Sequence, residues 1–94
     1  MADEMNRVEL RIHGRVQGVF YRATTREKAR ELGVDGWVQN LADGTVRAVA
    51  EGDEARLKEL VDWAHEGSPA AQVEAVDVEW GDAAGDFTDF QIKR

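Results

Sequence analysis

The chain has 94 residues, 43% of them hydrophobic, and a formal net charge of −7. This length suits a single small core, and the composition is that of a folded chain rather than a disordered one. The absence of cysteine excludes disulfides, thiol catalysis and thiolate metal sites, and two isolated histidines offer little to zinc. We therefore expect one domain over residues 1–94, without a metal or another cofactor.

Charge and hydropathy also limit the partners of the chain. An acidic protein is poorly suited to nucleic acid or to an anionic lipid surface. No apolar stretch approaches membrane-spanning length, and the first six residues lack the cationic and apolar regions of a signal peptide. We expect a cytoplasmic protein that binds neither nucleic acid nor membrane, and we take a monomer as the default.

The distribution of charge points to one basic region. Residues 1–30 contain seven basic and four acidic side chains, a net +3, whereas residues 31–94 contain five and fifteen, a net −10. An acidic chain that keeps a local basic patch is suited to binding a small anion there. Arginine also outnumbers lysine nine to three, which fits adaptation to high salt; an ordinary acidic cytosolic protein is the open alternative.

The first half of the chain predicts a strand, a helix and a second strand. Apolar and polar residues alternate over 8–12, which is the period of a strand with one buried face. Residues from about 22 to 32 are rich in helix formers and are followed by Gly33, a typical helix terminator. Residues 34–40 predict the second strand.

A hairpin and a second helix follow. Ala42-Asp43-Gly44 predicts a tight turn in which glycine supplies the positive φ, and residues 45–51 predict the third strand. Asp53 is a good N-cap for a helix, which fades over residues 65–69. Residues 73–80 predict a fourth strand, and residues 87–93 a short closing strand.

The resulting order, β-α-β-β-α-β with a short final strand, predicts an α+β fold. It is the ferredoxin-like (split βαβ) sandwich, in which two helices cover one face of an antiparallel sheet. In the usual arrangement the third strand lies between the first two, which then run in the same direction. Their carboxyl ends share one sheet edge, so the loop that follows the first strand and Asn40 should lie close together.

That loop has the construction of an anion site. A strand ends in a segment with two glycines, Gly14 and Gly18, and a helix begins with Arg22. Loop N–H groups and the unpaired first amides of a helix can converge on an anion. An arginine at a helix N-terminus opposes the macrodipole, and such local conflicts tend to fall at functional sites. A surface arginine paired with Glu27 is the structural alternative.

The chain lacks the sequence motifs of several well-known kinds of phosphate chemistry. There is no Gly-x4-Gly-Lys-Ser/Thr loop, no Cys-x5-Arg signature and no paired-Asp phosphotransfer motif. A hydrolase without a covalent nucleophile has to use a positioned water. An acyl phosphate suits this equipment because its carboxylate leaving group departs without a general acid.

Two segments of the chain carry a family resemblance. One is Gly14-Arg15-Val16-Gln17-Gly18-Val19-Phe20-Tyr21-Arg22, and the other is residues 36–40, followed by 43–46 and 51–52. At matching spacing, they resemble the first and second signatures of the acylphosphatase family. The resemblance implies metal-independent hydrolysis of the carboxyl–phosphate bond of a small acyl phosphate, giving a carboxylate and inorganic phosphate.

Site residues follow from the same resemblance. Arg22 corresponds to the phosphate-binding arginine. Asn40 corresponds to the residue that holds the attacking water, or orients it with help from an oxygen of the bound phosphate. Arg15 is expected to add electrostatic attraction. The phosphate cradle is expected from the amides of Val16, Gln17, Gly18, Val19, Phe20 and Tyr21.

The chain departs from the commonest family pattern in three places. Leu41 stands where many members have a hydroxyl residue, Ser68 separates Gly67 from Pro69, and the chain ends in Lys93-Arg94 where an aromatic residue is common. None of these changes touches the two catalytic candidates. The alternative function is a non-catalytic anion-binding or regulatory module, since this fold serves many functions.

Overall fold

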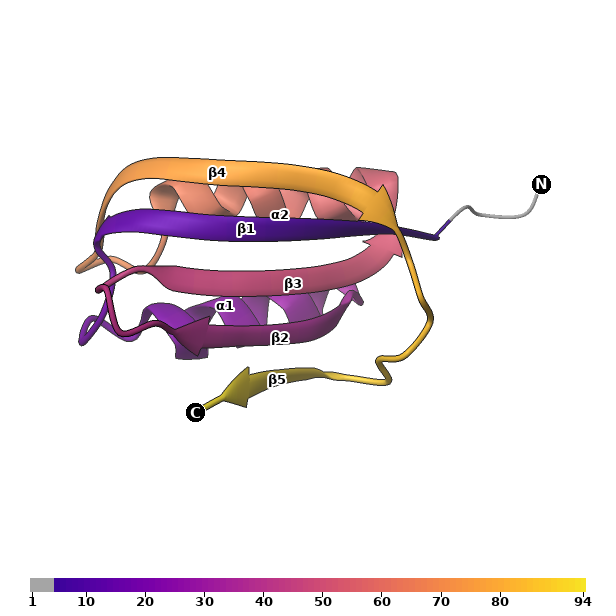
Figure 1. The fold of residues 1–94 in the computed structure, drawn as a ribbon, viewed down its shortest axis with the longest axis horizontal. Helices are drawn as coiled ribbons and strands as arrows, with labels where there is room; N and C mark the ends of the chain where they lie inside the picture. The colour runs from indigo at the N-terminus through magenta and orange to yellow at the C-terminus, as the bar shows by residue number, and fades with distance from the viewer. Residues whose placement is uncertain (1–4) are drawn as a thin grey trace.

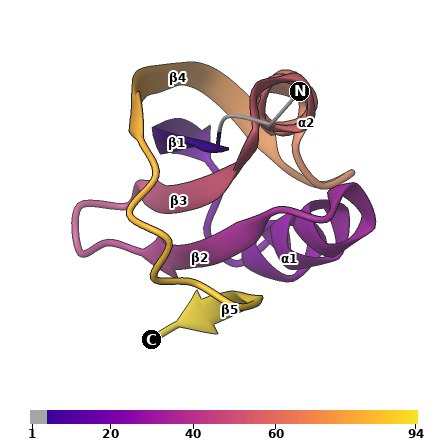
Figure 2. The same cartoon turned by 90° about the vertical axis from the view of Figure 1, so that its right-hand side faces the viewer.

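The computed structural model describes residues 5–94 as one five-stranded sheet with two helices on one face (Figures 1 and 2). The predicted α+β, ferredoxin-like architecture is confirmed. Among the described residues, no helix has the length and apolarity needed to cross a membrane. In chain order the elements are β1 (Met5–Arg15), α1 (Tyr21–Leu32), β2 (Asp35–Asn40), β3 (Val46–Asp53), α2 (Glu54–Glu66), β4 (Gln72–Asp82) and β5 (Phe90–Lys93).

The strand order is β4-β1-β3-β2-β5. β3 pairs antiparallel with both β1 and β2, so the first two strands run in the same direction, as predicted. The expectation of an entirely antiparallel sheet is wrong for β5, which pairs parallel with β2. The segment after β4 crosses the end of the sheet to the opposite edge (Figure 1). The chain therefore enters β5 from the end at which β2 begins.

The strand boundaries differ from the predicted ones most clearly at Gly14. This residue belongs to β1 and follows a bulge in the pairing with β4. Its φ is +123°, and a Cβ atom there would lie 2.2 Å from the carbonyl oxygen of Gln72. Glycine is therefore required by the close approach of β4, and the cradle loop begins only at Val16.

The core lies between the sheet and the helices. The predicted alternation in β1 is confirmed, since Val8, Leu10 and Ile12 are all buried. The predicted helix ends are also confirmed: Asp53 accepts a hydrogen bond from the Arg56 N–H at 2.9 Å, and Gly33 ends α1 in the left-handed region. These signals act over one turn of chain, which is why the sequence shows them.

Gly36 decides how closely β2 approaches β3. A Cβ atom at this position would lie 1.9 Å from the carbonyl oxygen of Val49, and the φ of Gly36 is +150°. Gly36→Ala is expected to lower the free energy of unfolding by more than about 3 kcal/mol, because backbone atoms have to move. Urea unfolding measures this loss. Gly81→Ala is the control: it meets nothing within 4 Å and should change stability by less than about 0.5 kcal/mol. Equal effects of the two changes would contradict this account.

Candidate active site

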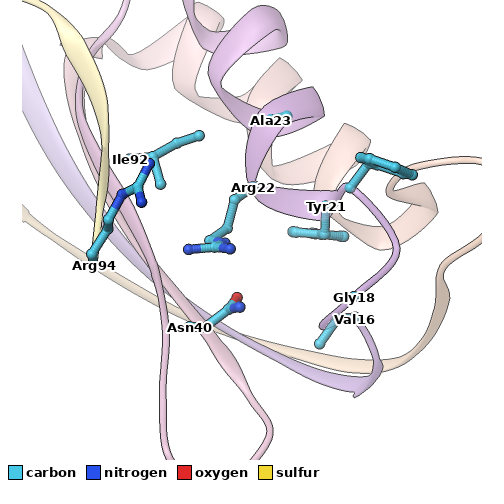
Figure 3. A pocket seen from close by; sticks show the side chains of 9 residues that line it. Val16, Gly18, Tyr21, Arg22, Ala23, Asn40, Ile92 and Arg94 are labelled. Atoms are coloured by element: carbon cyan, nitrogen blue, oxygen red, sulfur yellow. The ribbon is translucent and has the colours of Figure 1, made fainter.

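The carboxyl ends of β1 and β2 lie at the same end of the sheet, beside a cavity of about 370 Å³ (Figure 3). The structure brings the cradle loop, Arg22 and Asn40 together there, although Arg22 and Asn40 come from different elements. The residues that line the cavity are Val16, Gly18, Phe20, Tyr21, Arg22, Ala23, Asn40, Ile92 and Arg94.

The backbone of the loop offers a row of unpaired donors. Within the described chain, no N–H group from Val16 to Ala23 donates a backbone hydrogen bond. The loop includes Gly18 at φ +74° and Phe20 at φ +62°, the latter being the N-cap of α1. The left-handed region costs a non-glycine residue about 1–2 kcal/mol, and such strain is found where it serves an anion-binding loop.

Buried contacts hold this loop in place. The side chains of Val16 and Val19 are in the core, and the Ser68 hydroxyl donates to the Val19 carbonyl at 2.7 Å. The Tyr21 hydroxyl donates to the carbonyl of Ala64 at 2.8 Å, and burial raises the pKa of Tyr21. The neutral phenol therefore ties α1 to α2 as a permanent donor. Ser68 therefore helps to hold the cradle loop in place, whereas the sequence predicts only a change within the loop that contains Ser68.

Arg22 is the second residue of α1 and is half-buried. The alternative pairing with Glu27 is absent, and within residues 5–94 Arg22 forms no ion pair. No acidic residue lies in the first turn of the helix to offset its charge. Both the guanidinium and the positive helix end therefore favour an anion in the cavity.

Asn40 is the last residue of β2 and pairs with Val46 of β3. Its Oδ1 atom is buried and has no hydrogen-bond partner within the described residues. A buried acceptor left without a partner costs about 1–3 kcal/mol. Asn40 therefore brings to the lining of the cavity an acceptor whose hydrogen-bonding capacity is unused within the described residues.

The hairpin after Asn40 is fixed by its own turn. The Leu41 N–H donates to the Thr45 carbonyl at 2.9 Å. The Asp43 carboxylate accepts hydrogen bonds from the Thr45 hydroxyl at 2.6 Å and the Thr45 N–H at 3.0 Å, and it also pairs with Arg11. These contacts, the Thr45 hydroxyl first, lower the pKa of Asp43 to about 2. The charged form thus stabilises the turn throughout the neutral range.

Gln17 connects the cradle loop to this hairpin. Its Nε2 group donates to the carbonyl of Leu41 at 2.7 Å and to the carbonyl of Thr45 at 2.9 Å. Gln17 is not among the residues that line the cavity. It therefore sets the position of the loop relative to Asn40, and its own side chain is directed at the protein rather than at a ligand.

The structure separates two other residues from the cavity. Arg15 is the exposed last residue of β1, directly before the loop, and is not among the residues that line the cavity; its expected electrostatic attraction stays a prediction. His13 lies 2.8 Å from the Asp77 carboxylate on the neighbouring strand β4. Within residues 5–94, no three histidine or acidic side chains gather into a group that could ligate a metal ion.

Sequence reasoning missed three lining residues: Ala23, Ile92 and Arg94. Ala23 follows Arg22 in the first turn of α1, where a free amide was foreseeable from helix geometry. Ile92 and Arg94 come from the end of the chain. Their place depends on the parallel pairing of β5 with β2, which no local pattern indicates.

Comparisons with known proteins identify the family of this chain. The acylphosphatase family model matches residues 8–92. An acylphosphatase of Rubrobacter xylanophilus is 51% identical over 98% of this chain and 84% of its own, and one of Natronomonas pharaonis is 49% identical over the full length of both. The crystal structure of a Bacillus subtilis acylphosphatase superposes with a TM-score of 0.92 at 31% identity, covering 95% of this chain and 99% of that one. The chain belongs to the acylphosphatase family.

Proposed function

We propose that this acylphosphatase cleaves the carboxyl–phosphate bond of an acyl phosphate by direct attack of water. Arg22 and the N–H groups of the loop bind the phosphate group, and Asn40 orients the water. The observation that carries the proposal is the meeting, in one cavity, of a cation, a row of N–H donors and a buried acceptor that all lack a partner within residues 5–94.

The phosphate group is held by charge and by fixed dipoles. A guanidinium can donate two parallel hydrogen bonds to phosphate oxygens. The N–H groups between Val16 and Ala23 are already in place and need no reorganisation when charge shifts on the phosphate during the reaction. Preorganised donors of this kind supply a large share of the stabilisation of a phosphoryl-transfer transition state.

The Oδ1 atom of Asn40, which has no partner within residues 5–94, favours a hydrolase over an anion-binding module. This atom is an acceptor, so it cannot bond directly to an oxygen of a phosphate dianion, which is also an acceptor. A water molecule between them satisfies both, because it donates one hydrogen to Oδ1 and one to the phosphate. This arrangement aims an oxygen lone pair of the water at phosphorus.

The reaction then balances without a metal ion or a protein base. The water oxygen forms a bond to phosphorus while the bond from phosphorus to the acyl oxygen breaks. The electron pair of the broken bond leaves with the carboxylate, and a water proton moves to a phosphate oxygen.

The residues that line the cavity belong to one chain, so we further propose that a monomer is active.

Release of phosphate from benzoyl phosphate tests this function. The purified protein should hydrolyse benzoyl phosphate at the same rate with and without EDTA, because its charge stabilisation comes from Arg22 and backbone N–H groups. Activity that appears only after addition of a divalent metal ion would refute the mechanism. Binding of inorganic phosphate without any turnover would instead support the non-catalytic alternative.

A further inference from the structure

The end of β5 forms a wall of the cavity. Because β5 runs parallel to β2, the carboxyl end of β5 lies at the same end of the sheet as Asn40. Ile92 and Arg94 line the cavity from this side, and Figure 3 shows the Arg94 side chain beside Ile92 and across from the loop at Val16 and Gly18. The cavity thus has a second arginine, which comes from a different element than Arg22.

The charges of these two arginines are not neutralised within the described part of the chain. Five of the nine arginines pair with a carboxylate: Arg7, Arg11, Arg30, Arg47 and Arg56. Four arginines form no such pair within residues 5–94, and two of them, Arg22 and Arg94, line the cavity, whereas Arg15 and Arg26 do not; the lining contains no Asp or Glu side chain. In a chain with a net charge of −7, two unpaired cations in one cavity indicate a ligand with more than one anionic group.

The two cations occupy different parts of the cavity. Arg22 is in the first turn of α1, next to the unpaired loop amides, and there it serves the phosphate group. Arg94 is exposed at the opposite wall. The cavity volume of about 370 Å³ is within the range of small-ligand pockets, roughly 300–1,000 Å³. This volume is large enough for a phosphate group together with a small acyl group.

We propose that Arg94 makes the enzyme selective for acyl phosphates whose acyl group carries a second anionic group, such as a carboxylate. The guanidinium of Arg94 binds that group in a fork of two hydrogen bonds, and half-buried Ile92 contacts the apolar part of the acyl group. This selectivity rests on the hydrolytic function proposed above.

A matched pair of substrates tests the selectivity. Benzoyl phosphate and 4-carboxybenzoyl phosphate share the reactive bond and the ring, and only the second carries a further anion. The wild-type protein should show a kcat/KM about tenfold higher for the carboxylated substrate, the size expected for a partly exposed charge-assisted contact. Added salt should reduce this ratio by screening.

Variants of the last two residues assign the effect. Arg94→Gln should bring the ratio of the two kcat/KM values close to one, and Arg94→Glu should invert it. Lys93→Gln is the matched control, because Lys93 lies outside the cavity lining with its amino group 4.3 Å from the centre of the Trp37 ring. It should leave the ratio as in the wild type.

Each other outcome has a distinct meaning. A wild-type ratio of one or less, or an Arg94→Gln variant that keeps the wild-type ratio, overturns the selectivity proposal. An equal loss on both substrates also overturns it, since Arg94 would then contact the phosphate group. A wild-type protein that hydrolyses neither substrate refutes the proposed function itself. The benzoyl phosphate assay described above detects that outcome separately from the selectivity test.

Discussion

Arg22→Ala is expected to lower kcat/KM for benzoyl phosphate by about a thousandfold or more, the range for removing a charged transition-state contact. The folded state should at the same time become slightly more stable. Arg22 lies in the first turn of α1 without an ion-pair partner in the described chain, where a cation opposes the helix dipole by about 0.3–1 kcal/mol. Loss of activity with a gain in stability is the signature of a residue kept for binding.

Inorganic phosphate provides the second readout for Arg22. Phosphate should raise the midpoint of thermal unfolding of the wild-type protein, because a ligand of the folded state stabilises it, and it should have little effect on Arg22→Ala. Arg26→Ala is the matched control on the same helix, one turn further on and outside the cavity lining. Full activity in Arg22→Ala, or undiminished protection by phosphate, would contradict the assigned role.

Asn40→Ala is expected to lower kcat by about 10²–10³-fold, because a water without its acceptor is no longer oriented. Phosphate binding should persist in this variant, since Arg22 and the loop amides are unchanged. Its stability should not fall below that of the wild type, because the Oδ1 atom makes no hydrogen bond within residues 5–94 that the change would remove. Steady-state kinetics and phosphate-dependent thermal unfolding measure the two effects separately.

Asn40→Asp sharpens the same test. A carboxylate at this position keeps the acceptor but places a negative charge beside the phosphate site, so phosphate protection should fall together with turnover. If Asn40→Ala lost phosphate binding as severely as Arg22→Ala, Asn40 would be a phosphate ligand. The water-positioning role would then be wrong.

Much of the fold followed from signals that act over a few residues. Alternation in β1, the Asp53 N-cap, the Gly33 terminator and the Asp43-Gly44 turn all appear in the structure where the sequence predicts them. These signals are local because backbone hydrogen bonding and side-chain capping involve neighbours within one turn. The element order then predicted the shared edge of β1 and β2.

The errors fell where distant strands decide the conformation. The sequence predicts Gly14 in the loop, yet pairing with β4 keeps it in β1. The sequence predicts only a loop difference at Ser68, yet its hydroxyl donates a hydrogen bond to the Val19 carbonyl. Both outcomes depend on contacts between segments about fifty or more residues apart, and no periodicity or spacing reports such contacts.

The sequence by itself determined the family, and it singled out the loop and the two residues that are proposed to bind phosphate and orient water, because each depends on residue types at short and regular spacing. Only the tertiary structure decided that Gln17 joins the loop to the hairpin, that the acceptor atom of Asn40 is buried without a partner among residues 5–94, and that Arg94 lines the cavity. The physical reason is strand pairing. The parallel pairing of β5 with β2 is stabilised by contacts far apart in the chain, and it alone brings a second unpaired arginine to the site.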